Sequence, residues 1–216
     1  MNKQTINIVG AGTLGSFTTL LLAKMLGVES KIICWDEDRV ARHNMLNQLY
    51  LPEDIRRYKV DALKKTVGYL SGTKLETKRA MVGRNTKISG IVVALVDKME
   101  ARREIFEACK YRTDISLYIE ARAGGNGALV YALRPPRDPD WVKRYEKTLY
   151  TDAAGIPAQC ATRETLDVSW LVAASIARIL MRHLGAKPQP SEFIEVVIDA
   201  ADLPIVTSKV YNDWSA

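Results

Sequence analysis

The chain has 216 residues, which suits one large domain or one domain with a small appendage. Its composition, 47% hydrophobic and 26% charged, is ordinary for a soluble globular protein. No apolar segment is long enough to cross a membrane, because the best candidate, residues 168–181, is interrupted by Arg178. The first residues run directly into a predicted strand, so we expect no signal peptide, no membrane partner and a cytoplasmic location.

The net charge of +6 comes from basic residues scattered along the chain, which favours a solvated basic surface over nucleic-acid binding. The three cysteines, Cys34, Cys109 and Cys160, are widely spaced and form no CxxC pair. The only histidines are His43 and His183. The sequence therefore predicts neither a disulfide framework nor a zinc site.

The first half of the chain alternates between strand and helix patterns. The run GIVVALV at 90–96 is apolar without alternation, as expected for a central parallel strand that is covered on both faces. In chain order, the patterns predict strand 5–9, helix 14–26, strand 31–35, a helix from 51 to about 70, strands 73–78 and 90–96, helix 99–110 and strand 115–121. This order implies an α/β fold with a Rossmann-like, doubly wound and mainly parallel sheet.

The pattern changes after residue 122. The remaining predicted elements are strand 128–133, a turn-rich RPPRDPD segment, a short helix near 141–149, a loop over 151–163, a long helix over 164–184, and strands 193–198 and 205–210. We expect one domain over 1–216, with a Rossmann-like core (1–134), a loop-rich crossover (135–163) and a C-terminal helix with antiparallel strands (164–216). The long helix is apolar on most faces, which indicates burial against the sheet or a dimer contact.

The segment INIVGAGTLG places the motif GxGxxG between a predicted strand and a predicted helix. Gly10 permits the tight turn, Gly12 lets a phosphate approach the backbone, and Gly15 lets the helix pack closely. Asp36 follows Gly15 by 21 residues and ends the next strand, where a carboxylate meets a ribose hydroxyl. This pattern alone fits NAD, FAD or ATP, or a tight turn without a ligand.

Further polar residues follow the predicted strands at characteristic intervals. They are Asp38, Asn44 and Gln48 in WDEDRVARHNMLNQ, Lys59 in RYKVDALKK, and Asp97 with Arg102 after GIVVALV. This combination resembles the ThiF/MoeB adenylyltransferase family, whose larger relatives are the ubiquitin-activating enzymes. The family pattern joins a glycine loop to D-x-D-x-V, N-L-x-R-Q and G-x-x-K, and then to an aspartate that follows a hydrophobic strand. The resemblance covers residues 5–135 well and the remainder in outline.

The resemblance implies ATP-dependent activation of a carboxylate. In the family, the C-terminal carboxylate of a small ubiquitin-like or sulfur-carrier protein attacks the α-phosphate of ATP, which gives an acyl-adenylate and pyrophosphate. Members are commonly homodimers, and we expect one here. Carried over by position, the resemblance assigns Asn44 and Gln48 to the phosphates, Lys59 to the triphosphate and Asp97 to Mg²⁺. The other residues that it assigns to the nucleotide are Gly10, Gly12, Thr13, Leu14, Gly15, Asp36 and Asp38.

The chain departs from the family pattern at three points. Asn47 replaces the arginine of N-L-x-R-Q, which in relatives reaches the γ-phosphate across a dimer interface. The zinc-binding CxxC pairs of many relatives are missing, and Thr13 replaces a glycine. Four other arginines are candidates to replace the missing cation: Arg39, Arg42, Arg56 and Arg57.

Several of these residues also fit a purely structural role. The acids at 36–38 fit a solvated turn, and Lys59 fits an exposed helix face among other basic residues. Asp97 fits the N-cap of the following helix, and Arg102 fits a surface residue.

Two features of the second half have open interpretations. Cys160 precedes a predicted helix, with Arg163 nearby, so it fits either a nucleophile with a lowered pKa or a small buried residue. The glycine-rich segment 121–127 fits either a hairpin connection or a place where a substrate tail approaches the backbone.

The sequence therefore predicts an adenylyltransferase that uses ATP and Mg²⁺ on the C-terminus of a protein partner. One alternative is an NAD-dependent oxidoreductase, which leaves Asn44, Gln48, Lys59 and Asp97 without a role. The other is a non-catalytic nucleotide-binding or scaffold member of the same fold, for which the missing arginine is the best support.

Overall fold

A computed structural model describes residues 4–27, 31–151, 166–185, 191–201 and 205–212. The strands are β1 (Thr5–Val9), β2 (Lys31–Trp35), β3 (Glu76–Lys78), β4 (Gly90–Ala94), β5 (Ile115–Gly124), β6 (Gly127–Arg134), β7 (Glu192–Asp199) and β8 (Ile205–Tyr211). The α-helices are α1 (Thr13–Leu26), α2 (Lys59–Ser71), α3 (Met99–Cys109), α4 (Pro139–Glu146) and α5 (Leu166–Gly185). Two short 3₁₀-helices, η1 (Arg42–Leu46) and η2 (Pro52–Asp54), lie between β2 and α2.

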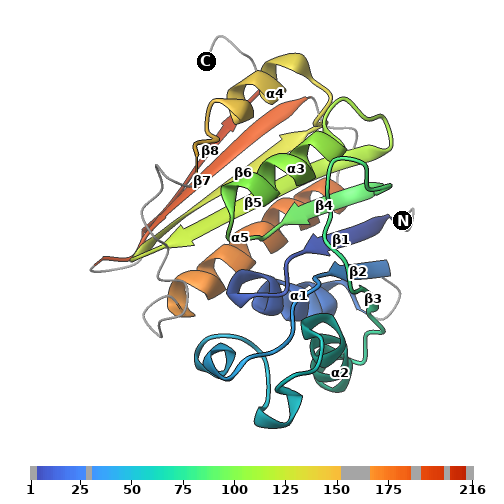
Figure 1. Ribbon diagram of the computed structural model, residues 1–216. Coiled ribbons are helices and arrows are strands. Elements are labelled where there is room, and N and C mark those ends of the chain that lie inside the picture. Colours follow the sequence, from blue (N-terminus) through green and yellow to red (C-terminus); the bar gives the residue numbers. More distant parts are fainter. Residues whose placement is uncertain (1–3, 28–30, 152–165, 186–190, 202–204, 213–216) are drawn as a thin grey trace.

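The eight strands form one mixed sheet in the order β3-β2-β1-β4-β5-β6-β7-β8 (Figure 1). The first five in this order pair in parallel, and β5 to β8 pair antiparallel. The parallel half begins with β1 at its centre and extends to both sides, as expected for a doubly wound sheet. The predicted fold class is therefore confirmed, including the antiparallel C-terminal strands.

Helices cover both faces of the sheet, and each face has its own apolar core. Side chains of α1, α2 and α5 pack against one face, where Ile8 and Val93 contribute from the central strands. Side chains of α3 and α4 pack against the other face, around Tyr118 and Tyr145. Because β4 is buried on both sides, it reads in the sequence as an apolar run without alternation.

The predicted helix over 51–70 is wrong in its first part. Residues 52–54 form only the single turn η2, and α2 begins at Lys59. The intervening segment folds back along the end of β2: the Val40 N–H donates to the Arg57 carbonyl at 2.9 Å, and the Arg56 N–H donates to the Val40 carbonyl at 2.9 Å. Arg56 has a φ of 74°, which a continuous helix does not allow. The predicted strand 73–78 is likewise shorter, since only β3 pairs with β2.

The turn between β1 and α1 brings two backbone segments into close approach. Gly10 has a φ of 100°, in the region that favours glycine. A Cβ atom on Gly15 would lie 1.9 Å from the Gly10 carbonyl oxygen, whereas a Cβ atom on Gly12 would meet nothing within 4 Å. The glycine motif therefore packs the first turn of α1 directly against the loop and leaves open space above Gly12.

This difference predicts opposite outcomes for two matched substitutions. Gly15→Ala should lower the free energy of unfolding by about 1–3 kcal/mol, because the added methyl group forces helix and loop apart. Gly12→Ala, the control, should change stability by less than about 0.5 kcal/mol. Urea unfolding followed by circular dichroism measures both, and a Gly15→Ala protein as stable as wild type would contradict the close approach.

Candidate functional site

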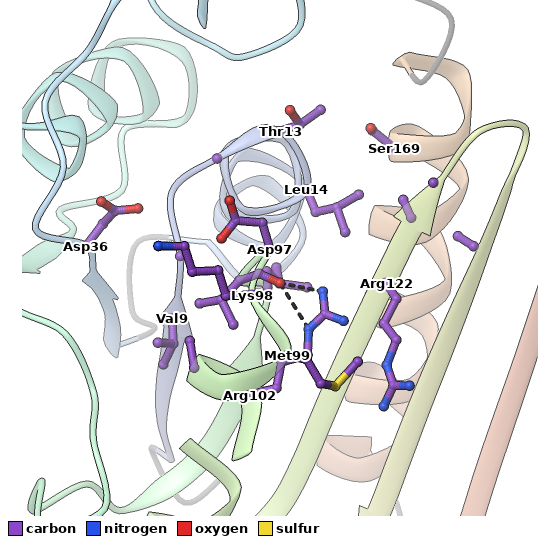
Figure 2. A pocket seen from close by; sticks show the side chains of 18 of the residues that line it. Val9, Thr13, Leu14, Asp36, Asp97, Lys98, Met99, Arg102, Arg122 and Ser169 are labelled. Carbon is purple, nitrogen blue, oxygen red and sulfur yellow. Dashed lines mark hydrogen bonds between the residues drawn. The ribbon is translucent and has the colours of Figure 1, made fainter. Parts of the chain in front are cut away.

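A large pocket lies at the carboxyl ends of the parallel strands, where doubly wound sheets bind ligands. Its volume is about 1440 Å³. It is lined by the β1–α1 turn, the segment after β2, the β4–α3 turn, the β5–β6 hairpin and the end of β7. Figure 2 shows Asp97 and Lys98 near its centre, with Asp36 on one side and Arg122 on the other.

The β1–α1 turn supplies the backbone of the pocket. The Gly10 N–H donates to the Trp35 carbonyl of β2 at 2.9 Å, which ties the turn to the neighbouring strand. Gly12 is the N-cap of α1, and Gly12, Thr13 and Leu14 all line the pocket. Gly15 does not line it, because it lies beneath the turn against Gly10. The backbone N–H groups of this first turn have no earlier helical carbonyl to bond.

Asp36 connects the turn to the segment after β2. One carboxylate oxygen accepts a hydrogen bond from the Ala11 N–H at 2.7 Å, and the other accepts one from the Asp38 N–H at 2.8 Å. Burial raises the pKa of Asp36 above its ordinary value, while the bond from Ala11 and the charge of Lys59 oppose that rise. Asp36 is therefore an ordered part of the site, and the solvated-turn interpretation is wrong for it.

Lys59, the first residue of α2, points into the pocket. Its Nζ atom lies 2.8 Å from a carboxylate oxygen of Asp38, and its side chain is only 12% exposed. The Lys59 N–H also donates to the Asp38 carbonyl at 2.8 Å. The interpretation of Lys59 as part of an exposed basic helix face is therefore wrong.

Asn44 and Gln48 reach the pocket from η1 and the turn after it. The Asn44 side chain is buried, and its Oδ1 accepts a hydrogen bond from the Ala41 N–H at 2.7 Å. This bond fixes the start of η1, so Asn44 has a structural role whatever else it contacts. The Oε1 atom of Gln48 is buried and has no hydrogen-bond partner among the described residues. A buried acceptor without a partner marks a place where a ligand or water fits.

Asp97 follows β4 and lies exposed in the pocket. The N-cap of α3 is Lys98, whose own side chain makes no capping hydrogen bond. The N-cap interpretation of Asp97 is therefore wrong. Its carboxylate has no hydrogen bond or ion pair with any described residue, so it is available to a ligand.

A buried ionic cluster lies behind the β4–α3 turn. Glu120 of β5 is fully buried between two arginines: its carboxylate lies 3.3 Å from Nε of Arg102 and 2.9 Å from Nε of Arg122. Arg102 also donates from Nε to the Val96 carbonyl at 3.1 Å, beside Asp97 (Figure 2). Tyr145 donates its hydroxyl to Glu120 at 3.3 Å. Arg102 is thus a buried residue that secures the turn, and of its two interpretations the one as a surface residue is wrong.

Glu120 and Arg122 were not predicted as site residues. The sequence offered one signal for them, the charged pair in ISLYIEARAG inside an otherwise apolar strand. Such charges are buried only when they are paired. Arg122 also donates to the Thr148 carbonyl at 2.7 Å and lies against the rings of Tyr131 and Tyr150. The cluster therefore joins β5 to the segment after α4.

The glycine-rich segment 121–127 forms a hairpin connection, as one of its two interpretations expects. It is an antiparallel hairpin in which Gly124 pairs with Gly127, so the connection is only two residues long. The same glycines line the far end of the pocket, beside Val197 and Asp199 of β7. A hairpin connection and a substrate approach are thus compatible here.

The cysteines give little information about the chemistry of the pocket. Cys34 and Cys109 are buried, and burial raises the pKa of both thiols, that of Cys109 to about 12, so neither is a nucleophile. Cys160 lies outside the described residues.

Of the four arginines proposed to replace the missing one, none lines the pocket. Arg39, for example, stacks on Tyr58 at 4.0 Å and donates to the Arg56 carbonyl.

Two further features of the described residues concern metal-binding clusters and membrane-spanning helices. They contain no cluster of three or more His, Cys, Asp or Glu side chains that could hold a metal ion by itself. No helix among them has the length and apolar character that a bilayer crossing requires.

The fold of this chain resembles several solved structures. E. coli MccB with succinimide matches with a TM-score of 0.70 and 17% identity, over 95% of this chain and 63% of that chain. E. coli MccB with AMPCPP and MccA matches with a TM-score of 0.68 and 16% identity, over the same shares. PaaA matches with a TM-score of 0.65 and 18% identity, over 97% of this chain and 73% of that chain. At these identities the likeness is one of fold, and this chain spans less than two thirds of MccB.

No curated protein matches the chain significantly. The sequence model of the ThiF family does match, over residues 1–199. The residues that it covers include the glycine turn, Asp36, Lys59 and Asp97. Because the match covers most of the sequence, this chain belongs to the ThiF family.

Proposed function

We propose that this chain is an adenylyltransferase that binds Mg²⁺ and ATP and activates the C-terminal carboxylate of a small protein or peptide. The observation that carries the proposal is that one pocket is lined by the β1–α1 turn, Asp36, Lys59 and Asp97. The members of this set lie far apart in the sequence. A dinucleotide-binding site would explain the turn and Asp36, but it would give no role to Lys59 or Asp97.

The pocket fits a nucleoside triphosphate at several points. The space above Gly12 and the N-terminal end of the α1 dipole suit a phosphate. The carboxylate of Asp36 accepts one bond at each oxygen and retains lone pairs for a ribose hydroxyl. The apolar part of the wall, which suits a purine base, contains Trp35, Met81, Val82, Met99 and Ile105. A solved structure of E. coli MccB contains ATP, which supports the same ligand class here.

Asp97 fits one magnesium ion in combination with ATP. Mg²⁺ is commonly bound by one or two carboxylates together with substrate phosphates and water, rather than by a full protein cage. A single free carboxylate beside the phosphate turn meets that requirement, even though the described residues contain no larger acidic cluster. When bound, the ion neutralises charge on the phosphate oxygens.

The proposed chemistry needs orientation and charge neutralisation more than proton transfer. An oxygen of the substrate carboxylate attacks the α-phosphorus, the new acyl–phosphate bond forms, and the bond to the β-phosphate breaks. Pyrophosphate leaves with the electron pair of that bond, and no proton is exchanged with the protein. Lys59 and the N–H groups of the turn oppose the negative charge on the phosphates.

The carboxylate substrate would enter from the β5–β6 hairpin. The glycines there have no side chains, and this part of the pocket is continuous with the part that contains Asp97. A solved structure of E. coli MccB contains MccA, which supports a small substrate of this kind. A ubiquitin-like or sulfur-carrier partner, a homodimer and a thioester at Cys160 remain predictions.

Calorimetric titration with Mg·ATP, NAD and NADH, each used separately, tests the proposal. Binding of ATP but not of NAD or NADH is expected. Binding of NAD alone would overturn the proposal in favour of a redox enzyme. With a cognate partner, pyrophosphate release should follow; tight ATP binding without any turnover would favour a non-catalytic role.

Asp97→Asn should remove the effect of Mg²⁺ on nucleotide affinity. In the wild-type protein, Mg²⁺ should strengthen ATP binding, whereas the variant should bind ATP equally with and without the ion, because the neutral amide is a poor magnesium ligand. Glu37→Gln is the matched control, because Glu37 also lines the pocket and is exposed. The fold should be intact in both, and a normal Mg²⁺ response in Asp97→Asn would refute the assignment.

Glu120→Gln should destabilise the protein and weaken ATP binding. It leaves two buried arginines without a carboxylate, which should lower the free energy of unfolding by about 3 kcal/mol. It should also loosen the turn that bears Asp97, since Arg102 links that turn to Glu120. The control is Glu104→Gln, which breaks an exposed pair with Arg84 and should cost less than about 1 kcal/mol. Equal stabilities of the two variants in urea unfolding would contradict this account.

A further inference from the structure

The lining of the pocket contains more carboxylates than lysine and arginine side chains. Its lining contains the carboxylates of Asp36, Glu37, Asp38, Asp97 and Asp199, and the cations of Lys59, Lys98, Arg102 and Arg122. A triphosphate brings further negative charge into this acid-rich space. The site therefore needs a cation that is not already neutralised by a protein carboxylate.

Three of the four cations are already engaged. Lys59 is paired with Asp38 at 2.8 Å. Arg102 and Arg122 are both paired with Glu120, at 3.3 Å and 2.9 Å, and they are buried. Each of these pairs reduces the field that the cation exerts on a ligand.

Lys98 differs from the other three. It lines the pocket and is exposed, and its side chain makes no hydrogen bond or ion pair with any described residue. Figure 2 shows this side chain extending from the β4–α3 turn toward the side of the pocket where Asp36 lies. Its charge is therefore directed into the space between the two carboxylates that the proposed function assigns to ribose and metal.

The backbone beneath Lys98 is fixed although its side chain is free. The Lys98 carbonyl accepts a hydrogen bond from the Arg102 N–H at 3.2 Å, in the first turn of α3. Arg102 also bonds the Val96 carbonyl through its side chain, two residues before Lys98. A flexible ammonium group on an anchored base can follow a phosphate without moving the turn.

Position 47 does not supply this cation. Asn47 is neutral and 2% exposed, and it does not line the pocket. His43 also lines the pocket. Among the described lysines and arginines of the lining, Lys98 is thus the one without an ion pair to a described residue.

We propose that Lys98 contacts the triphosphate of the bound nucleotide and supplies the positive charge that Asn47 lacks. This inference rests on the proposed function, because it requires that the pocket binds ATP. Lys98 is assigned as a ligand-binding residue, and its contribution should depend on the number of phosphates.

Calorimetry with ATP, AMP and adenosine on Lys98→Gln tests the assignment. Loss of a charged contact should weaken ATP binding roughly 10- to 100-fold, weaken AMP binding less, and leave adenosine binding unchanged. Lys98→Arg, which keeps the charge, should restore most of the ATP affinity. The matched control is Lys87→Gln, because Lys87 is exposed and does not line the pocket. It makes the same change in net charge and should bind ATP as the wild-type protein does.

Each other outcome has a definite meaning. Unchanged ATP affinity in Lys98→Gln, or an equal loss for ATP and adenosine, would overturn the assignment while the proposed function stands. An equal loss in Lys87→Gln would show a general charge effect and would also overturn it. Failure of the wild-type protein to bind ATP would overturn the proposed function and the assignment together. Thermal unfolding should be the same in all variants, since the Lys98 ammonium makes no hydrogen bond or ion pair with the residues that the structure describes.

Discussion

The carboxylate of Asp36 is the interaction on which the site depends. It accepts one hydrogen bond from the backbone of the β1–α1 turn and another from the segment after β2. It therefore adds a side-chain link between the turn after β1 and the segment after β2, beyond the backbone bond from Gly10 to Trp35. Burial opposes ionisation of Asp36, and the bonds from Ala11 and Asp38 offset that effect. A carboxylate that is already ordered in this way needs little reorganisation when a ligand arrives.

A second constraint acts on the other side of the pocket. Glu120 holds Arg102 and Arg122, and Arg102 in turn holds the carbonyl that precedes Asp97. Burial also raises the pKa of Tyr145, so its phenol remains protonated and donates to Glu120. Buried ionic groups of this kind are poor sources of stability compared with apolar side chains. Their value here is geometric, because they connect β5, α3 and the segment after α4 around a single carboxylate.

The sequence was informative where local pattern decides structure. Gly10 and Gly15 occupy positions that only glycine tolerates, and β4 is apolar on both faces, so both could be predicted. The start of α2 could not, because it depends on backbone bonds between Val40 and residues 56–57 that form only in the folded chain. Glu120 was missed for a similar reason. A charge inside a strand has meaning only once its partners are known, and Arg102 comes from another element.

The arrangement of the pocket bears on the geometry of any adenylation that it carries out. Displacement at phosphorus places the incoming and leaving oxygens roughly in line. Asp97 and Lys98 lie near the centre of the pocket, with Asp36 on one side and Arg122 on the other (Figure 2), and the β1–α1 turn and the β5–β6 hairpin both line it. In the proposed reaction, a carboxylate that enters past the hairpin would attack a nucleotide whose phosphates are bound at the turn. The two central residues carry opposite charges, so a phosphate would pair directly with Lys98, whereas the Asp97 carboxylate would need a metal ion between itself and the phosphates.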